Sequence, residues 1–240
     1  MGDNLIHLNW LRKVVRWSGR PAIHYCDPVY FSSLAPFIAG DAIELAPLSA
    51  VSADAVDSWI NAGGEYENVA FRRNWVWFHL EHFEALARRL EIPNLASKRR
   101  HLRFNHPLVP GSPNRMGRFD VLLINSVPRS GQFPNYDGQA FRGLVSWLLD
   151  HGKTVVTTEP TGLCPSTIEA RLSVWDIGRL SIDCGFIASV NTGPLWPTFN
   201  IWTEDKPRIV WCQIHEFPLN DRTVTLTRVD QAYDIFRRFT

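Results

Sequence analysis

The most specific chemical signal in the sequence is a polar turn after an apolar run predicted to be a strand. The turn consists of Asn191, Thr192, Gly193, Pro194, Leu195 and Trp196. Proline is common at the first position of a helix, where its missing N–H is not needed. A helix starting here would present free amides and its positive dipole end to an anion such as a diphosphate. Thr192 adds a hydroxyl and Gly193 permits close backbone approach, but an ordinary strand-to-helix turn explains these residues equally well.

Two more loops follow predicted strands and contribute polar side chains. In an open parallel sheet, ligands bind beyond the carboxyl ends of the strands, so these loops are candidates for the same site. Arg129 can supply positive charge to a diphosphate. Glu159 can hydrogen-bond a ribose or a base, or it is simply an exposed loop carboxylate. The candidate ligand-binding residues of these loops are Ser126, Arg129, Ser130, Gln132, Thr158 and Glu159.

Aromatic residues are numerous, with 10 Trp, 14 Phe and 5 Tyr, and they can form a core or stack on sugars and bases. Trp196 and Trp202 are the stacking candidates, because they follow the predicted diphosphate turn. The three-residue spacing of Trp196 and Phe199 is equally typical of a buried stripe. Trp75 and Trp77 are predicted to be packing residues.

The first half of the sequence offers candidates for contact with a second substrate. His24 and Asp27 flank the end of a short predicted strand, and a buried, hydrogen-bonded histidine is the alternative for His24. A polar, glycine-rich loop is another acceptor-facing candidate, through Asn61, Gly63 and Gly64. His79, Glu81 and His82 match neither H-E-x-x-H nor H-x-x-E-H, so no metal site is predicted.

Several classes of protein are excluded or disfavoured by composition and by absent motifs. The sequence contains no G-x-S-x-G, no G-x-G-x-x-G and no P-loop. A balance of 25 Lys and Arg against 24 Asp and Glu argues against a nucleic-acid binder. The 45% hydrophobic content is enough to bury a core, which excludes wholesale disorder. Four widely spaced cysteines, and no apolar run near the roughly 18 residues of a membrane span, predict a cytoplasmic protein with reduced thiols.

Alternating helix and strand patterns must position these residues. In the first half, helical periodicity and strand-like runs alternate at 4–18, 22–26, 30–38, 42–48, 54–60 and 75–90. In the second half, apolar strands and helices alternate at 121–124, 139–149, 154–158, 176–183, 186–190 and 209–213. Near-continuous apolar strands that alternate with helices predict an α/β protein with a parallel sheet covered on both faces.

The composition changes between residues 105 and 118, where three prolines and two glycines fall in a stretch without periodicity. Such a stretch is typical of a connection between domains. We therefore expect an N-terminal domain over 1–108, a linker over 109–118 and a C-terminal domain over 119–240.

Short segments of both halves resemble glycosyltransferase family nine, the heptosyltransferase-like enzymes. In the second half these segments are residues 119–122, 176–181 and 190–196. In the first half, Gly2-Asp3 and the helix that follows are similar to the Leu-Gly-Asp loop of the family. The resemblance implies a GT-B fold, in which two Rossmann-like domains face each other across a cleft. It also implies that the turn at 191–196 binds the diphosphate of an activated sugar.

The resemblance assigns the catalytic role to Asp3, as the general base that deprotonates the acceptor hydroxyl. The cap of the first helix is the alternative role for this residue. The sequence departs from the family in that the N-terminal domain lacks its first strand. In addition, Asn191 replaces the usual Asp, Trp196 stands where the family often has His, and Arg129 or Gln132 must serve in place of a phosphate-binding Lys.

Together, the residues and the resemblance predict an inverting, metal-independent glycosyltransferase that moves a sugar from a nucleotide-diphosphate donor to a glycan or glycolipid hydroxyl. Its expected partners are the nucleotide sugar and the acceptor, with peripheral membrane contact through the acceptor, and no cofactor or nucleic acid. A non-catalytic nucleotide-sugar or glycan-binding protein of the same fold is the main alternative. An α/β protein of unrelated function is the other.

Overall fold

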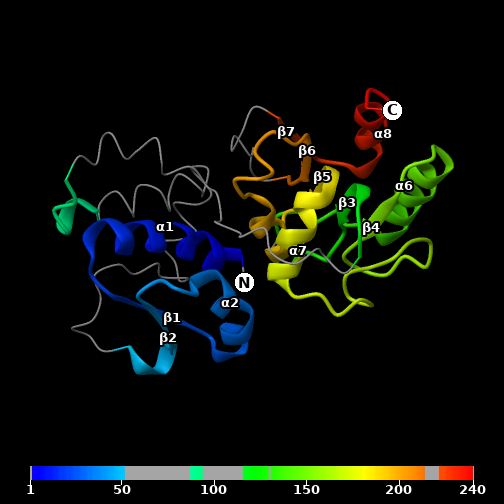
Figure 1. Ribbon diagram of the computed structural model, residues 1–240. Coiled ribbons are helices and arrows are strands. Elements are labelled where there is room, and N and C mark those ends of the chain that lie inside the picture. Colours follow the sequence, from blue (N-terminus) through cyan, green and yellow to red (C-terminus); the bar gives the residue numbers. More distant parts are fainter. Residues whose placement is uncertain (1, 52–86, 94–115, 130, 214–221, 240) are drawn as a thin grey trace. The chain divides into compact units, whose positions relative to one another are not determined.

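A computed structural model describes residues 2–51, 87–93, 116–129, 131–213 and 222–239 of the chain (Figure 1). Contacts between Cα atoms divide the chain into two compact units, Met1–Asn105 and His106–Thr240. The predicted helix at 54–60, most of the helix at 75–90 and most of the linker at 109–118 lie outside the described residues. Each unit contains a parallel sheet, so the predicted mixed α/β class with parallel strands is confirmed.

Besides the helical residues 87–89, the described part of the first unit consists of two helices and two strands with a short 3-10 helix after each strand. These elements are α1 (Gly2–Ser18), β1 (Ala22–Cys26), η1 (Pro28–Tyr30), α2 (Phe31–Ile38), β2 (Ile43–Pro47) and η2 (Leu48–Ala50). Strands β1 and β2 are parallel, with Ala22 beside Ile43 and Cys26 beside Pro47. The Asp27 side chain accepts a hydrogen bond from the Val29 N–H and so caps η1, which fixes the turn away from β1.

Helix α1 buries one face, and that face includes a charged residue. Leu5, Leu8 and other apolar residues at helical spacing are buried, as expected for an amphipathic helix. Arg12 is also buried and pairs with Asp41, whose side chain is 2% exposed and also binds Arg16 Nε at 2.7 Å. Because both arginines belong to α1 and Asp41 precedes β2, these ion pairs hold the helix against the sheet.

The second unit is built around a five-stranded parallel sheet in the order β4-β3-β5-β6-β7. Its strands are β3 (Phe119–Ile124), β4 (Val155–Thr157), β5 (Cys184–Val190), β6 (Arg208–Trp211) and β7 (Thr223–Leu226). The first four match strands predicted from apolar runs. The fifth, β7, was not predicted, because its four residues include two threonines and form no continuous apolar run.

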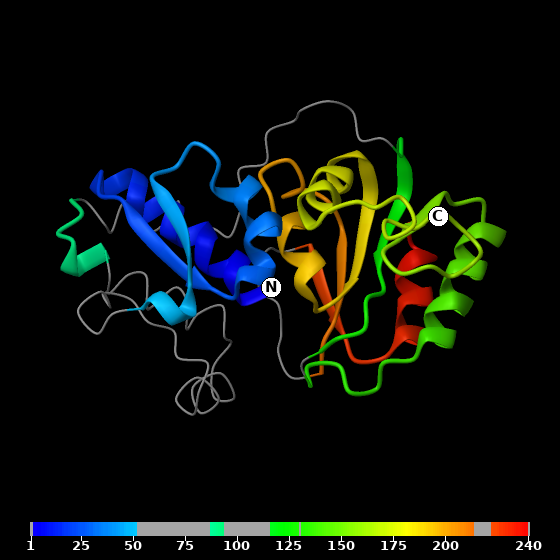
Figure 2. The same ribbon diagram turned by 90° about the horizontal axis from the view of Figure 1, so that it is seen from below.

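Helices cover both faces of this sheet, and alternate strand residues divide between two cores. Helices α6 (Gly138–Asp150) and α8 (Ala232–Phe236) pack over Val121 and Leu123 of β3. Helix α7 (Val174–Leu180) packs over Leu122 and Ile124 on the other face. Figure 2 shows α7 on one side of the sheet and α6 and α8 on the other. The predicted two-sided cover is therefore confirmed, and α8 is an additional helix.

The outer edge of β4 is covered by the loop that follows it. The Thr157 N–H donates to the Pro165 carbonyl oxygen at 3.1 Å, and the Thr167 N–H donates to the Thr157 carbonyl oxygen at 2.8 Å. An isolated parallel bridge joins Thr157 to Ser166. The outward-facing backbone groups of Thr157 are thus paired within the chain.

No helix in the described part of the chain is both long and apolar enough to cross a membrane.

Candidate functional site

The second unit has a topological switch point between β3 and β5. From β3, the chain goes first to β4 on one side and then returns to β5 on the other side. Loops that leave neighbouring strands in opposite directions mark the place where doubly wound sheets bind ligands. The predicted loops after β3, β4 and β5 all leave the carboxyl edge of this sheet, so the topology gathers them as the prediction required.

Hydrogen bonds of Thr158 join the ends of β3 and β4. Its buried hydroxyl accepts from the Asn125 N–H at 3.0 Å and from Ser126 Oγ at 2.9 Å. It donates to Asn125 Oδ1 at 3.1 Å, and the same oxygen accepts from the Glu159 N–H at 2.9 Å. The Thr158 hydroxyl is therefore used within the protein, and its role is to hold the two loops in register. Ser126 is half-buried beside it.

Gln132 joins the ends of β3, β5 and β6. The Asn191 side-chain amide donates to Gln132 Oε1, and the Gln213 N–H donates to the Gln132 carbonyl oxygen at 2.8 Å. Asn191 is 2% exposed, and its amide nitrogen also lies 4.0 Å from Cys212 Sγ. The side chains of Asn191 and Gln132 thus bind each other across the switch point.

The turn after β5 continues as the 3-10 helix η6 (Gly193–Thr198) and not as an α-helix. Pro194 lies in its first turn and Pro197 lies inside it. Thr192 precedes it without a side-chain cap, because its hydroxyl donates to the Val190 carbonyl oxygen at 3.3 Å. A helix this short aligns too few peptide dipoles to supply the anion site that a longer helix would have. Any ligand contact here must come from individual amides and hydroxyls.

Leu195 and Trp196 are core residues, with 0% and 1% of their surface exposed. The ring of Trp196 lies 5.8 Å from that of Phe199, so the two form the buried stripe that their spacing allowed. In this structure Trp196 offers no face for stacking on a ligand. Trp202, in contrast, is 47% exposed.

The loop after β3 contains the exposed cation of the candidate site. Arg129 is exposed, whereas Ser130 lies outside the described residues. Tyr136 anchors the loop, since its hydroxyl donates to the Asn125 carbonyl oxygen at 2.6 Å. Burial, with smaller contributions from Glu159 and Asp137, raises the pKa of Tyr136. The phenol therefore stays protonated as a hydrogen-bond donor at neutral pH.

The candidates in the first unit occupy different environments. Asp3 is exposed in the first turn of α1, which begins at Gly2. Its carboxylate therefore interacts favourably with the positive end of the helix dipole. His24 is 5% exposed, and its Nε2 lies 3.0 Å from Asn4 Oδ1. Burial lowers the pKa of His24 to about 4, so this histidine is neutral and hydrogen-bonded at neutral pH. Asn61, Gly63 and Gly64 lie outside the described residues, as do His79 and His82.

Several residues that build the site were not predicted to belong to it. They are Asn125, Tyr136, Arg208 and Gln213. For Asn125 a signal was present, because it is the first polar residue after an apolar strand. For Arg208 the signal is weaker: a basic residue stands directly before the predicted strand at 209–213. Tyr136 and Gln213 are recognisable only from the fold.

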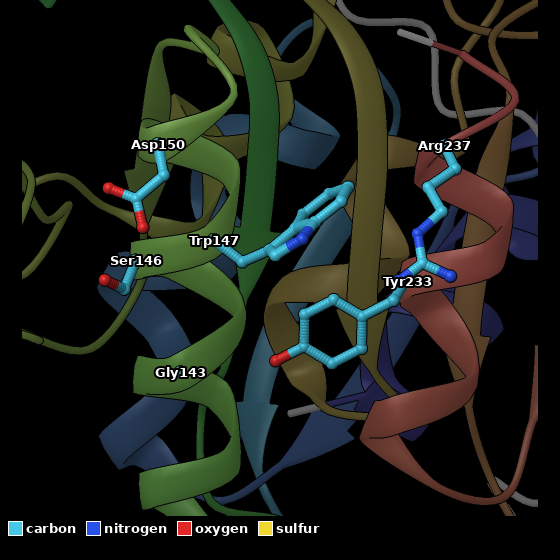
Figure 3. A pocket seen from close by; sticks show the side chains of 6 residues that line it. All are labelled: Gly143, Ser146, Trp147, Asp150, Tyr233 and Arg237. Carbon is cyan, nitrogen blue, oxygen red and sulfur yellow. The ribbon is translucent and has the colours of Figure 1, made fainter.

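A concavity of about 560 Å³ lies between α6 and α8, away from the switch-point loops. Figure 3 shows the Trp147 and Tyr233 side chains extending from α6 and α8 toward the space between the two helices. Their rings lie 5.3 Å apart at 87°. The remaining lining residues are Gly143, Ser146, Asp150 and Arg237. None of the predicted ligand-binding residues lines this concavity.

A parallel sheet with this strand order and with helices on both faces defines a doubly wound type of α/β domain. No model of a protein family matches the sequence, and no curated protein matches it. Solved structures are similar to it along nearly the whole chain. One is the E. coli heptosyltransferase WaaC with ADP, with a TM-score of 0.56 and 14% identity, covering 99% of this chain and 94% of that chain.

Two more solved structures give the same result. WaaC with ADP-2-deoxy-2-fluoro heptose has a TM-score of 0.53 at 12% identity and covers 100% of this chain and 96% of that chain. A glycosyl transferase of family 9 from Veillonella parvula has a TM-score of 0.54 at 8% identity and covers 98% of this chain and 85% of that chain. The chain therefore shares the fold of these glycosyltransferases, and the resemblance inferred from the short segments is confirmed in three dimensions.

Proposed function

We propose that this chain is an inverting glycosyltransferase that moves a sugar from a nucleotide-diphosphate donor to a glycan or glycolipid hydroxyl without a metal or cofactor. The observation that carries the proposal is the set of polar loops at the switch point of a sheet whose fold is shared with structures that hold ADP and an ADP-sugar. Ligands of doubly wound sheets bind at such a point.

The proposed donor site lies at the carboxyl edge of the second unit. Exposed Arg129 would offer positive charge to the diphosphate. Ser126 and Thr192 would donate from their hydroxyls after releasing their hydrogen bonds to Thr158 Oγ1 and to the Val190 carbonyl oxygen. Ser130 and Glu159 belong to the same loops, and Glu159 would contact the ribose or the base. Stabilising the charge that develops on the leaving diphosphate is the electrostatic part of catalysis.

The proposed chemistry is a single displacement. The acceptor oxygen attacks the anomeric carbon and the bond from that carbon to the diphosphate oxygen breaks, so the configuration inverts. The diphosphate leaves with the bonding electrons, and Asp3 takes the proton from the acceptor hydroxyl. In this proposal the chain has a GT-B arrangement of domains over 1–108 and 119–240. Asn61, Gly63 and Gly64 are proposed on the acceptor side, whereas His24 is buried and hydrogen-bonded to Asn4 and is assigned a structural role.

The variant Asp3→Asn tests this proposal. ADP- and UDP-linked sugars are screened for an increase in melting temperature, and the positive donors are then assayed for transfer or hydrolysis. The proposal expects turnover to fall by about 10²-fold or more in the variant, as for loss of a general base, with donor affinity unchanged. Glu44→Gln, an exposed carboxylate of β2, is the matched control and should retain activity. Unchanged turnover in Asp3→Asn would contradict the assignment of the base.

A second candidate function is a non-catalytic nucleotide-sugar or glycan-binding protein. The observation that favours it is the side chain of Asn191, which stands where the family usually has Asp and binds Gln132 instead of facing a ligand. Wild-type protein that binds a donor but neither transfers nor hydrolyses its sugar, with any acceptor offered, would support this function over the enzyme.

A further inference from the structure

A fully buried arginine lies beneath the turn that follows β5. Arg208 is the first residue of β6 and is 1% exposed. It alternates with Ile209, which belongs to the α6 side of the sheet, so Arg208 points to the opposite face, where η6 lies. A buried guanidinium loses its hydration, so its position requires compensating contacts.

The hydrogen bonds and the ring contact of the guanidinium go to one short segment, residues 198–203, at the end of η6 and just after it. Nη1 donates to Thr198 Oγ1 at 2.6 Å, and Nη2 donates to the Thr198 carbonyl oxygen at 3.0 Å and to Thr203 Oγ1 at 3.4 Å. The ring of Phe199 lies 4.1 Å from the guanidinium carbon, a distance typical of a cation–π contact. Arg208 thus caps the carboxyl end of η6, whose other end follows Asn191 and Thr192 at the switch point.

The charge of Arg208 is not neutralised by a nearby carboxylate within the described part of the chain. Burial lowers the pKa of Arg208 to about 9, so the side chain remains a cation at neutral pH. Lys206, two residues earlier, donates to the carbonyl oxygens of Ser181 at 3.1 Å and Ile182 at 2.5 Å. Within the described residues, the hydrogen bonds of these two cations go to neutral oxygens, although the Asp183 carboxylate lies near enough to Lys206 to favour its charged form.

A second network fixes the same segment against α7. The Asn200 side-chain amide donates to the Pro197 carbonyl oxygen at 3.1 Å and to Ser181 Oγ at 3.3 Å. Thr203 Oγ1 donates to the Thr198 carbonyl oxygen at 2.5 Å. The segment 197–203 is thus bound from both sides, and Arg208 is the only charged member of these contacts among the described residues.

We propose that Arg208 is a positioning residue for donor binding: it fixes η6, and with it the Asn191–Thr192 turn, and its charge favours a diphosphate at the switch point. This inference rests on the proposed function. It assigns to a buried residue part of the phosphate-binding role for which the sequence offered Arg129 or Gln132. Because Arg208 is covered, it acts through the turn and through its electric field, which a low-dielectric interior screens weakly.

Three variants separate the contribution of the positive charge of Arg208 from its contribution to fixing η6. Arg208→Met removes the charge and the hydrogen bonds, Arg208→Lys retains the charge without the planar fork, and Thr198→Val removes one acceptor and leaves the arginine. Arg222→Met is the matched control, because Arg222 is exposed beside the same pair of strands and its Nη1 donates to the Asp205 carbonyl oxygen at 2.6 Å. The full chain is used throughout.

The affinities for ADP, UDP, adenosine and uridine are measured by calorimetry, together with hydrogen exchange of the Leu195 and Phe199 amides. These two amides are hydrogen-bonded to Thr192 and Trp196 within η6. We expect Arg208→Met to weaken diphosphate binding about tenfold or more and nucleoside binding much less, as for the loss of a charge-assisted interaction. The diphosphate affinity of Arg208→Lys should lie between those of Arg208→Met and wild type. Hydrogen exchange of both amides should be faster in Arg208→Met and in Thr198→Val than in wild type.

The outcomes distinguish this inference from the proposed function. If wild type binds neither diphosphate, the proposed function is wrong. If wild type binds one of them and Arg208→Met binds it equally well, the inference about Arg208 is wrong while the proposed function stands. If Arg208→Met loses the same factor in affinity for the nucleoside as for the nucleoside diphosphate, the inference about Arg208 is also wrong, because a merely structural role affects both affinities. If Arg208→Met does not fold, Arg208→Lys and Thr198→Val decide by the same criteria.

Discussion

His24 illustrates how burial fixes the properties of a side chain that the sequence leaves open. Its imidazole is 5% exposed, with one hydrogen bond to Asn4 and a ring contact with His7 at 4.9 Å. Burial lowers the pKa of His24 to about 4, because a charged imidazolium would lose its hydration. At neutral pH the residue is a neutral part of the core of the first unit.

Acid should destabilise the first unit through His24. The folded-state pKa lies below the ordinary value of 6.5, so the unfolded chain binds the proton more tightly, and stability that is present above pH 6.5 is lost as pH falls toward 4. The loss between pH 7.5 and 4.5 should be about 2–3 kcal/mol. Urea unfolding at these two pH values, in wild type and in His24→Gln, measures it.

The variant His24→Gln should lose less stability on acidification than wild type, since it has no imidazole to protonate. Ile23→Thr is the matched control, because Ile23 is 50% exposed on the other face of β1 and this change should preserve the wild-type pH dependence. An identical acid loss in wild type and His24→Gln would contradict the role of His24.

Residue types alone could not separate core residues from ligand-binding residues. Trp196 and Trp202 look equivalent in the sequence, yet one is 1% exposed and the other 47%. The hydroxyl of Thr158 and the side-chain amide of Asn191 both form hydrogen bonds between loops. Such contacts depend on which strands are neighbours, and the order of strands is not contained in local sequence.

At the scale of elements, α7 depends on its first turn. Ser173 Oγ accepts from the Asp176 N–H at 3.2 Å, and the Ser173 N–H donates to Asp176 Oδ2 at 3.0 Å, which together form a capping box. The helix has only seven residues, and it carries Ile177 and Leu180 of the smaller core. A helix this short has little intrinsic stability, so its N-terminal cap and its packing against the sheet must stabilise it.

The change Ser173→Ala should therefore lower the free energy of unfolding by about 1 kcal/mol, the usual effect of losing a cap. Ser146→Ala is the matched control, since Ser146 is exposed in the middle of α6, where alanine is the better helix former. Urea denaturation of both variants and wild type makes the comparison. Equal stability of wild type and Ser173→Ala would show that the cap contributes nothing to the fold.

Most elements with an apolar run or a helical period were predicted correctly, including the short strands β1, β2 and β4, whereas β7 and α8 were missed. The strands from β3 to β6 form apolar runs because both of their faces are buried, and such runs are visible in the sequence. The five-residue helix α8 is too short to produce a helical period. The helix predicted after β5 is a 3-10 helix, and it contains two prolines, Pro194 and Pro197, within six residues.

At the scale of the whole molecule, ligand binding should be confined to one edge of one sheet. If the proposed donor site is correct, ADP or UDP should slow hydrogen exchange in peptides that cover residues 125–129, 158–162 and 191–195. Peptides from the concavity between α6 and α8, which contain Trp147 and Tyr233, serve as the internal control and should be unaffected.

Slower hydrogen exchange centred on α6 and α8 would place the nucleotide in the concavity between these helices and would contradict the proposed donor site. Inorganic pyrophosphate is a useful second probe, because it should protect the same three loops more weakly if the diphosphate is the part of the donor that they bind. These measurements use the full chain and require no knowledge of the sugar.

The fold of the whole chain proved more recognisable than its chemistry. Structures with only 8–14% identity share it, because many apolar sequences satisfy the same pattern of buried strands. Ligand contacts depend on single side chains such as Asn191 and Arg208, and identity at this level does not preserve them. The segments 190–196 and 176–181 therefore sufficed to indicate the fold, whereas the roles of the individual residues within them require experiment.

The covered edge of β4 has a consequence for behaviour at high concentration. A sheet edge with unpaired amides and carbonyls is a template on which strands of other molecules can add, and this is a common start of aggregation. Here the groups on the outer side of Thr157 are occupied by Pro165 and Thr167 of the same chain. The loop that follows β4 thus occupies the place at Thr157 where a strand of another molecule would add.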